Sequence, residues 1–411
     1  MSANAVNTST LVIGQPHVVS PASSALASLT GFYFSLRLVF VLVAVRFFHR
    51  DPQDGVIAGL VLNYLLLAAA AFYAAGPSQR TVASLLRLPC FSWVLCFLGL
   101  SGLSLSWSVT ASLPAAVAFW CAMAADTAIV VLLLRAAPVD SVVTSLIRGF
   151  VWGSCVIAAV AWALPSQSDL RLGDEELLGP NQIGWICAFA FFFAQYLIRS
   201  NCGNWTIQAL LLAVTLLRSL SKTTLIAFVI GEAYIMLRDR SMSRRTRLLL
   251  SVSALLIVLI FSSLLTDYYA VYTNAGNQAD TLTGRLGIWA FITNEGVEKP
   301  WFGHGFHSVW KVIPPFGEFE ARHAHNELLQ QFYAYGAVGV LLLIAIYSSV
   351  YRQLRRYLDA SQKTFFVGML LLVIVRGIAD TEAFDLSLPL WFIVLIGALV
   401  EQSRNRRQVF A

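Results

Sequence analysis

Charged side chains are scarce in this sequence. They make up 12% of its 411 residues, whereas a soluble domain carries about a quarter. Hydrophobic residues account for 58% of the chain and gather into runs that approach the roughly 20 residues needed to cross a bilayer. This composition excludes a soluble protein and favours one membrane domain.

Paired cysteines are also missing. The six cysteines lie in apolar runs or in one short loop and form no CxxC motif: Cys90, Cys96, Cys121, Cys155, Cys187 and Cys202. The sequence therefore predicts neither a disulfide framework nor a cysteine metal site.

About twelve apolar runs are candidate transmembrane helices. They fall at about 31–48, 55–75, 88–106, 112–134, 146–164, 182–198, 205–217, 223–237, 248–265, 331–350, 362–378 and 386–400. We therefore expect an all-α integral membrane protein of about 12 transmembrane helices, with helices 1–9 in residues 31–265 and helices 10–12 in residues 331–400. The runs 205–217 and 223–237 are short for a full crossing, which indicates broken or tilted helices.

Basic residues indicate the orientation of the chain, because Lys and Arg are retained on the cytoplasmic side. With the N-terminus inside, the three strongest basic clusters (238–247, 352–363 and 404–407) all fall on the cytoplasmic side. We expect a flexible cytoplasmic tail at 1–30 and a basic cytoplasmic tail at 401–411. Anionic lipid headgroups explain the net charge of +6, so nucleic acid is not implied as a partner.

One long polar segment, 266–330, is expected outside the membrane. It lies between two predicted spans and contains four of the six histidines. Loops longer than about 15 residues are usually functional or disordered, and the glycines and aromatic residues of this segment argue against disorder. We predict an extracytoplasmic catalytic loop with short helices of its own.

Short motifs follow one another along this loop and on either side of it. They are GPNQIG at 179–184, SLSKT at 219–223, TGRLGIW at 283–289, PWFGHGF at 300–306, HAHNELLQ at 323–330 and GAVG at 336–339. In this order they resemble the O-antigen ligase and polymerase family, over about 180–385. Two departures are Lys222, where many relatives have arginine, and a histidine motif that is doubled as His323 and His325.

The resemblance implies a multi-pass glycosyltransferase of the bacterial inner membrane. Its donor is expected to be an undecaprenyl-diphosphate-linked glycan, and its acceptor a second glycan or lipid A core. The resemblance further implies an inverting, metal-independent reaction on the periplasmic face, with no cofactor and with other polysaccharide-assembly proteins as partners. It leaves open whether the chain is an exopolysaccharide or O-antigen polymerase or an O-antigen ligase of lipopolysaccharide biosynthesis.

Four basic residues are predicted near the outer ends of spans, where basic residues are statistically disfavoured: Arg218, Lys222, Arg285 and Arg376. Arginine pairs with phosphate oxygens in a bidentate manner. We therefore expect Arg285 to be catalytic and the other three to bind the diphosphate. The alternative is a snorkelling side chain or a salt bridge to an acid such as Asp380 or Glu382.

An acceptor hydroxyl needs a base whose pKa lies near the working pH, a task suited to histidine. The resemblance places the key histidine at His325, because it directly precedes Asn326. We expect His325 to be the base, with Asn326 and His323 in contact with substrate, although His323 stays open as the base. The alternative is that His325 braces the start of the following helix and that Asn326 caps it.

A metal site is the competing interpretation of this loop, because the loop contains four histidines and two glutamates: His304, His307, His323, His325, Glu318 and Glu320. Their spacing does not match the HExxH arrangement on a helix, so no metal is predicted.

Two acids inside predicted spans, Asp126 and Glu232, are expected to pair with basic residues on neighbouring helices. The alternative function is a transporter or lipid-linked glycan flippase, because about twelve spans with both termini inside is also a transporter topology. A noncatalytic scaffold of an envelope assembly is a third alternative, and it would not need the loop's arginine and histidine together.

Overall fold

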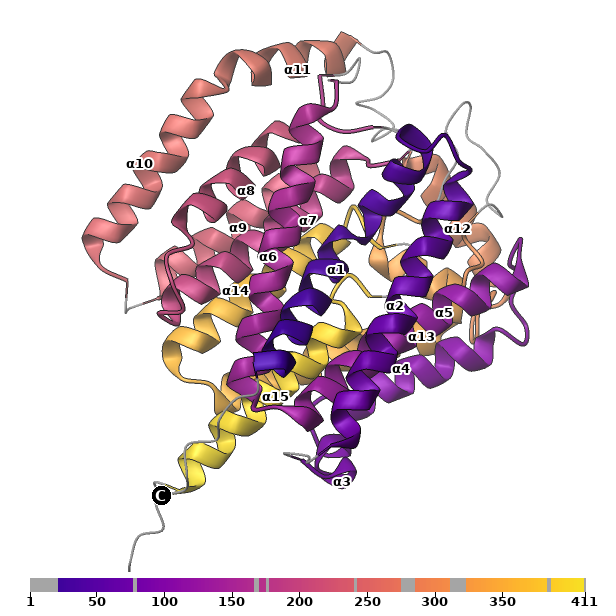
Figure 1. The fold of residues 1–411 in the computed structure, drawn as a ribbon. Helices are drawn as coiled ribbons and strands as arrows, with labels where there is room; N and C mark the ends of the chain where they lie inside the picture. The colour runs from indigo at the N-terminus through magenta and orange to yellow at the C-terminus, as the bar shows by residue number, and fades with distance from the viewer. Residues whose placement is uncertain are drawn as a thin grey trace, which may run out of the picture.

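The computed structural model describes residues 21–76, 80–165, 170–174, 177–239, 242–274, 285–310, 323–382 and 386–409. The regular elements of these residues are helices (Figure 1): α1 (Pro21–Arg46), α2 (Pro52–Ala75), α3 (Val82–Leu86), α4 (Phe91–Ser104), α5 (Leu113–Ala136), α6 (Val139–Ala163), α7 (Pro180–Arg199), α8 (Thr206–Arg218), α9 (Lys222–Arg238), α10 (Arg244–Ile260), α11 (Ser262–Asn274), α12 (Arg285–Glu298), α13 (Glu327–Tyr357), α14 (Ala360–Gly377) and α15 (Leu390–Val409).

The predicted all-α membrane fold is confirmed. Each predicted apolar run overlaps one of these helices, and seven helices are long and apolar enough to cross a membrane: α1, α2, α5, α6, α7, α13 and α14. Two shorter helices, α4 and α8, are also apolar. The full number of about twelve crossings stays a prediction.

The first helix begins earlier than expected. α1 starts at Pro21, inside the segment 1–30 that we assigned to a flexible tail; residues 1–20 of that tail lie outside the described residues. Small side chains explain the difference, because they let α1 pack closely on α6. A β-carbon on Gly149 would lie 1.8 Å from the carbonyl oxygen of Ser28, and the hydroxyl oxygens of Ser24 and Ser145 are 2.6 Å apart.

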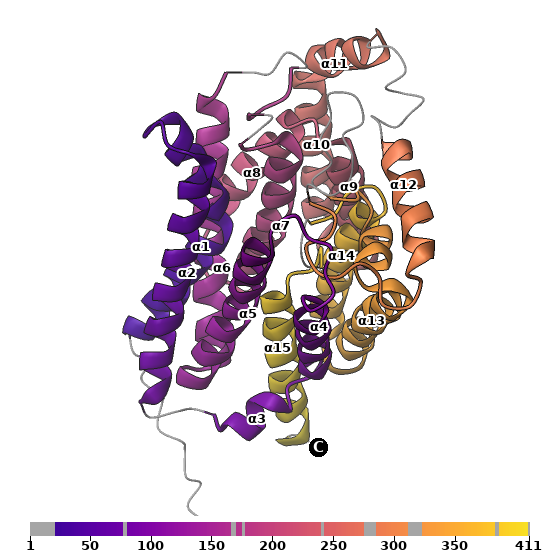
Figure 2. The same cartoon turned by 90° about the vertical axis from the view of Figure 1, so that its right-hand side faces the viewer.

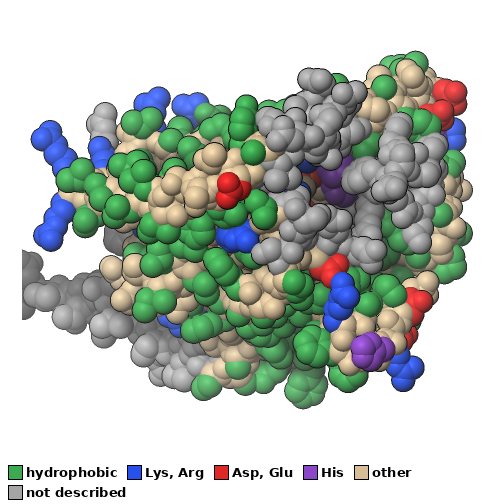
Figure 3. Space-filling view, turned by 90° about the horizontal axis from the view of Figure 1, so that it is seen from above, with side chains coloured by type: hydrophobic (Ala, Val, Ile, Leu, Met, Phe, Trp, Pro, Cys, Tyr) green, Lys and Arg blue, Asp and Glu red, His purple; other side chains and the backbone are tan. Residues whose placement is uncertain are grey.

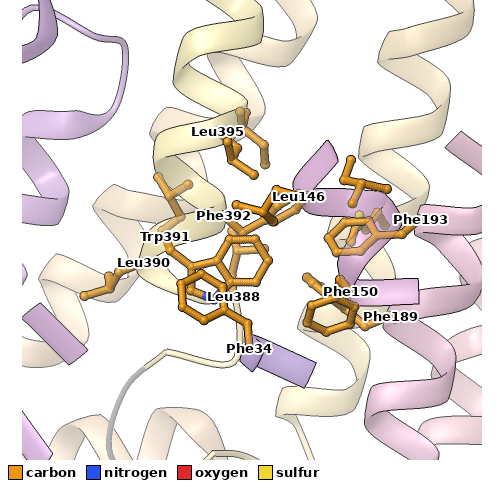
Figure 4. Close-up of a cluster of buried hydrophobic side chains, with 14 of the residues drawn as sticks. Phe34, Leu146, Phe150, Phe189, Phe193, Leu388, Leu390, Trp391, Phe392 and Leu395 are labelled. Carbon is orange, nitrogen blue, oxygen red and sulfur yellow. The ribbon is translucent and has the colours of Figure 1, made fainter. Parts of the chain in front are cut away.

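Aromatic side chains fill the centre of the bundle, where α1, α6, α7 and α15 meet (Figure 4). Phe150 of α6 packs edge-on against Phe193 of α7, with ring centroids 5.1 Å apart. Phe34 of α1 lies 5.0 Å from Trp391 of α15. These contacts fix α15 as a central helix of the bundle, although it is not among the seven span-like helices.

The three basic clusters lie at one end of the bundle, which we call the basic end (Figures 1 and 2). Asp239, after α9, accepts a hydrogen bond from Ser361 at the start of α14, and Arg407 of α15 donates to the carbonyl oxygen of Leu358. The opposite end, which we call the site end, carries the turn between α8 and α9 and the described parts of the segments that join α6 to α7, α12 to α13 and α14 to α15. The three basic clusters therefore share one end of the bundle, and the cytoplasmic orientation of that end stays a prediction.

The two intramembrane acids have different partners. Arg37 donates to Asp126 over 2.7 Å, which confirms the predicted ion pair between α1 and α5. Glu232 instead accepts a hydrogen bond from the amide of Gln195 over 3.1 Å. Among the described residues, the direct ion pair of Arg199, the nearby base on α7, is with Asp239, so the pairing expected for Glu232 stays a prediction.

Candidate functional site

The two upstream motifs lie against each other at the site end. Asn181, in the first turn of α7, accepts hydrogen bonds from Ser221 over 3.0 Å and from Arg171 over 2.8 Å. A β-carbon on Gly184 would lie 2.8 Å from the β-carbon of Ser221. Glycine is therefore needed at 184 for α7 to approach the turn between α8 and α9.

The two downstream glycine motifs interlock through the backbone. Gly336 interrupts α13 with φ 64° and ψ −156°, a conformation that is essentially restricted to glycine. The break frees the carbonyl oxygens of Tyr333 and Ala334, which accept hydrogen bonds from His304 and Gly305 over 2.9 and 2.8 Å. The turn at 300–305 is thereby fixed to the start of α13.

α12 is held over this junction by a small core of its own. Its buried side chains come from α12, from α13 and from the chain between them: Ile288, Ile292, Val309, Ala324 and Tyr333. Trp289 also donates from its indole nitrogen to the carbonyl oxygen of Ala324 over 2.9 Å. The described part of the predicted loop from residue 285 onward is therefore packed onto α13.

The four loop histidines divide into separate places. His304 stacks on Tyr333 at 4.4 Å. The Nδ1 of His307 lies 2.7 Å from the hydroxyl of Thr110, and the ring stacks on Phe119. Burial lowers the pKa of His307 to about 4. These two histidines therefore brace the loop and stand apart from His323 and His325, while Glu318 and Glu320 lie outside the described residues.

His325 contacts a carboxylate that is distant in sequence. Its Nδ1 lies 3.2 Å from Oδ1 of Asp380, and both side chains are buried. His325 also has φ 51°, a left-handed conformation that non-glycine residues rarely adopt and that is often found at functional sites. Its backbone N–H donates to Nδ1 of His323 over 3.3 Å. The two histidines and the acid thus form one cluster.

Asp380 is held by further groups around this cluster. Its second oxygen lies 3.4 Å from Arg376, and the backbone N–H of Thr381 donates to its first oxygen over 3.1 Å. Burial by itself would raise the pKa of Asp380, but Arg376 and the hydrogen bond with His325 outweigh burial, so this pKa lies below its usual value. Asp380 therefore stays ionised at neutral pH.

Arg376 is buried and held on two sides. Its guanidinium lies 4.4 Å from the ring centroid of Trp185 on α7, and it pairs with Glu382 over 3.2 Å as well as with Asp380. These ion pairs are the salt bridges stated above as the alternative to diphosphate binding by Arg376.

The pKa of His323 lies well below its usual value. Desolvation is the largest cause, the nearby charge of His325 is the second, and Arg376 and Arg285 act in the same direction.

Arg285 and Asn326 join the loop to the helices beneath it. Arg285, the first residue of α12, donates to the hydroxyl of Thr223 on α9 over 3.3 Å and to the carbonyl oxygen of Ala379. Asn326 accepts from the backbone N–H of Leu329 over 2.9 Å as the N-cap of α13, which is the alternative stated for this residue; its contact with substrate stays a prediction. The Asn326 amide also donates to the carbonyl oxygen of Ile378 over 2.7 Å.

Arg218 and Lys222 flank the turn between α8 and α9. Arg218 donates to the carbonyl oxygen of Leu170, and Lys222 is exposed beside Thr223, the partner of Arg285. All seven predicted site residues therefore lie at the site end: His325, His323, Asn326, Arg285 and Arg376 around Asp380, and Arg218 and Lys222 at the adjoining turn. Viewed from above, histidine reaches the surface near the middle of the molecule (Figure 3).

Three contributors were not predicted as site residues. Asp380 was named only as an ion-pair partner of Arg376, and its contact with His325 depends on tertiary packing. Trp185 directly follows the GPNQIG motif, and Thr223 is the last residue of the SLSKT motif. These positions are the signals that the sequence offers for them.

The cluster of His323, His325 and Asp380 has ligand atoms within 4.8 Å of one another, close enough to hold a metal ion. The Arg376 guanidinium already pairs with Asp380. A metal ion at this cluster would be repelled by the guanidinium or would have to displace it from Asp380, so these three side chains fit a metal poorly.

Residues 207–344 match the family model described as O-antigen ligase. The match begins in α8 and ends in α13, and it includes Arg218, Lys222, Arg285, His323 and His325. No curated protein matches the chain. Over this segment the chain is similar to the O-antigen ligase family, and together with the span-like helices the match supports a membrane glycan-processing enzyme.

Proposed function

We propose that this protein transfers or polymerises undecaprenyl-diphosphate-linked glycan repeats on the periplasmic face of the bacterial inner membrane, by an inverting and metal-independent mechanism. The observation that carries the proposal is the contact of His325 with Asp380, next to the carbonyl oxygen of Ala379 to which Arg285 donates. This arrangement places an oriented imidazole next to a guanidinium, which are the two groups that a glycosyl transfer from a diphosphate requires.

His325 acts as the base in this mechanism. Its Nδ1–H donates to Asp380, which leaves the lone pair on Nε2. The acceptor hydroxyl gives its proton to Nε2 while its oxygen attacks the anomeric carbon from the face opposite the diphosphate. The bond from that carbon to the phosphate oxygen breaks, its electron pair stays on the diphosphate, and the configuration inverts. Asp380 stabilises the imidazolium that results.

Arg285 stabilises the charge that develops on the departing diphosphate, with Arg218 and Lys222 at its other end. Preorganised charge in a site of this kind is usually the largest contribution to catalysis. Arg376 is buried with Asp380 and Glu382, so we assign it to positioning Asp380. Asn326 positions His325 by capping α13, and His323 supports it from the other side.

The decisive experiment is transfer by the purified protein in lipid, using undecaprenyl-diphosphate-linked glycan as donor and free or carrier-linked glycan and lipid A core as separate acceptors. Arg285→Ala and His325→Ala are assayed beside the wild type, and each is checked for folding by its unfolding temperature. Release of the carrier with growth of the glycan, lost in both folded variants, supports the transferase. The productive acceptor separates polymerase from ligase.

The opposite result is also specific. Absence of turnover with every acceptor, together with movement of the lipid-linked glycan across vesicles by both variants, would refute the transferase in favour of a flippase.

A further inference from the structure

The helices α8 and α9 do not pack against each other along their lengths. α8 packs against α6 and α7, whereas α9 packs against α14 and α7. Helices joined by a turn this short normally pair as antiparallel neighbours. Here the contact is limited to the turn at 219–221, where Leu220 has φ 53°.

Both helices present apolar side chains on the sides that lack a helix partner. These side chains, which we call the α8–α9 face, are all exposed: Ile207, Leu210 and Leu211 on α8, and Ile226, Val229, Ile230 and Leu237 on α9. Behind them the ring of Phe191 on α7 packs edge-on against Phe228 on α9 at 5.0 Å. Both helices therefore carry exposed apolar side chains, and both pack against α7.

α10 runs beside α8 and α9 (Figures 1 and 2) without an extended contact to either helix. Among the described residues, its extended helix contact is with α11 alone. The first turn of α10 contacts the bundle through a hydrogen bond of 2.6 Å from Arg247 to the carbonyl oxygen of Asp239. Its apolar side chains are exposed along its length: Leu248, Leu249, Leu255, Leu256 and Leu259. Two unpartnered apolar surfaces thus stand side by side.

Positive charge lies at the site end of this face. Arg218 ends α8, Lys222 begins α9, and Thr223 accepts a hydrogen bond from Arg285. A molecule with an anionic head and one long apolar chain complements the positive charge and the apolar face together. Its head would contact the turn between α8 and α9, and its chain would follow the two helices toward the opposite end of the bundle.

We propose that the polyprenyl chain of the lipid-diphosphate donor binds along the α8–α9 face, with α10 as the outer wall. This inference rests on the proposed function, since that function supplies the donor. Bulk phospholipid is the alternative occupant, and it would show no preference for one isoprenoid chain length over another.

The first test changes the face and varies the donor. Val229→Trp fills it with a bulky side chain, and the matched control is Val61→Trp on α2, which is also exposed. Turnover is measured with a glycan on undecaprenyl diphosphate and on a two-isoprene diphosphate. We expect Val229→Trp to raise KM for the long donor about tenfold, through lost apolar contact, and to leave the short donor and kcat nearly unchanged. A long-donor KM equal to that of Val61→Trp would overturn the proposal.

The second test does not depend on turnover. Undecaprenyl diphosphate carrying a diazirine on its chain is irradiated with wild-type protein in lipid vesicles, and the labelled peptides are mapped. Stronger labelling of α8, α9 and α10 than of α2 supports binding of the chain along the α8–α9 face. If the same protein shows no glycan transfer, that result counts against the proposed function and not against the α8–α9 face. Equal labelling of α2 and α9 in a protein that transfers glycan would refute binding of the chain along the α8–α9 face and leave the proposed function standing.

Discussion

Gly336 approaches the backbone of Trp301 so closely that a β-carbon on the glycine would lie 2.3 Å from the tryptophan carbonyl carbon. Gly336→Ala should therefore separate the turn at 300–305 from α13, because alanine fits neither the space nor the backbone conformation. We expect a loss of about 3 kcal/mol or more in the free energy of unfolding. Unfolding in detergent and glycan transfer should both show the loss.

Gly99→Ala is the matched control for that change. Gly99 lies inside α4, and no atom outside its own helix lies within 4 Å of the β-carbon that alanine would add. Alanine in a helix interior is favoured over glycine by about 1 kcal/mol. The control should match or exceed the wild-type unfolding temperature, and equal behaviour of the two variants would contradict the role assigned to Gly336.

Asp380→Asn tests the orientation of His325. An asparagine cannot hold the proton on Nδ1 as a carboxylate does, and it leaves the imidazolium uncompensated, so kcat should fall by about 10²-fold. Glu382→Gln is the comparison, because Glu382 pairs with the same Arg376 without contacting His325 in the described structure. Losses of the same size in both variants would show that only the charge balance of Arg376 matters.

Arg285→Ala should reduce kcat for glycan transfer by about 10²-fold or more, since a guanidinium at the leaving diphosphate contributes most when charge develops. Arg285→Lys should recover only part of the activity, because lysine has a single charged nitrogen. Arg50→Ala, an exposed arginine in the segment between α1 and α2, is the control. Steady-state kinetics with the lipid-linked donor provides the measurement, and full activity of Arg285→Ala would reject the proposed role.

His307 should make stability depend on pH. Burial lowers the pKa of His307 to about 4 from 6.5, so between these two values the unfolded chain binds the proton more readily than the folded chain. Its contribution to stability is therefore complete above about pH 6.5 and is lost as the pH falls toward 4. His307→Phe, which keeps the ring on Phe119, should flatten the fall of unfolding temperature in this window. Parallel curves for variant and wild type would contradict the prediction.

Chelation should leave transfer unchanged. Arg376 already provides the positive charge beside Asp380, so the cluster of His323, His325 and Asp380 does not require a cation for charge balance. Activity after dialysis against EDTA is compared with activity after restoring Zn²⁺ or Mg²⁺. A loss on dialysis that one of these metals reverses would replace the arginine-based account with a metal-based one.

The apolar runs gave the helices reliably, because membrane spans are set by length and hydropathy. Helix boundaries depend on features that hydropathy does not record: α1 extends back to Pro21 because small residues near Ser28 pack on Gly149. The site residues at 285, 323 and 325 could be named from their motifs. Asp380 could not be paired with His325, since 55 residues separate them and only the packing of α13 against α14 brings them together.

Arg218 and Arg285 each donate to a main-chain carbonyl oxygen, that of Leu170 and that of Ala379. A carbonyl carries no net charge, so exchanging that one contact for a phosphate oxygen separates no opposite charges at the contact itself. Under the proposed function, the two carbonyl oxygens would keep the guanidinium groups oriented between turnovers. Under the proposed function, this exchange would lower the cost of product release, the step at which a site built only for tight diphosphate binding would stall.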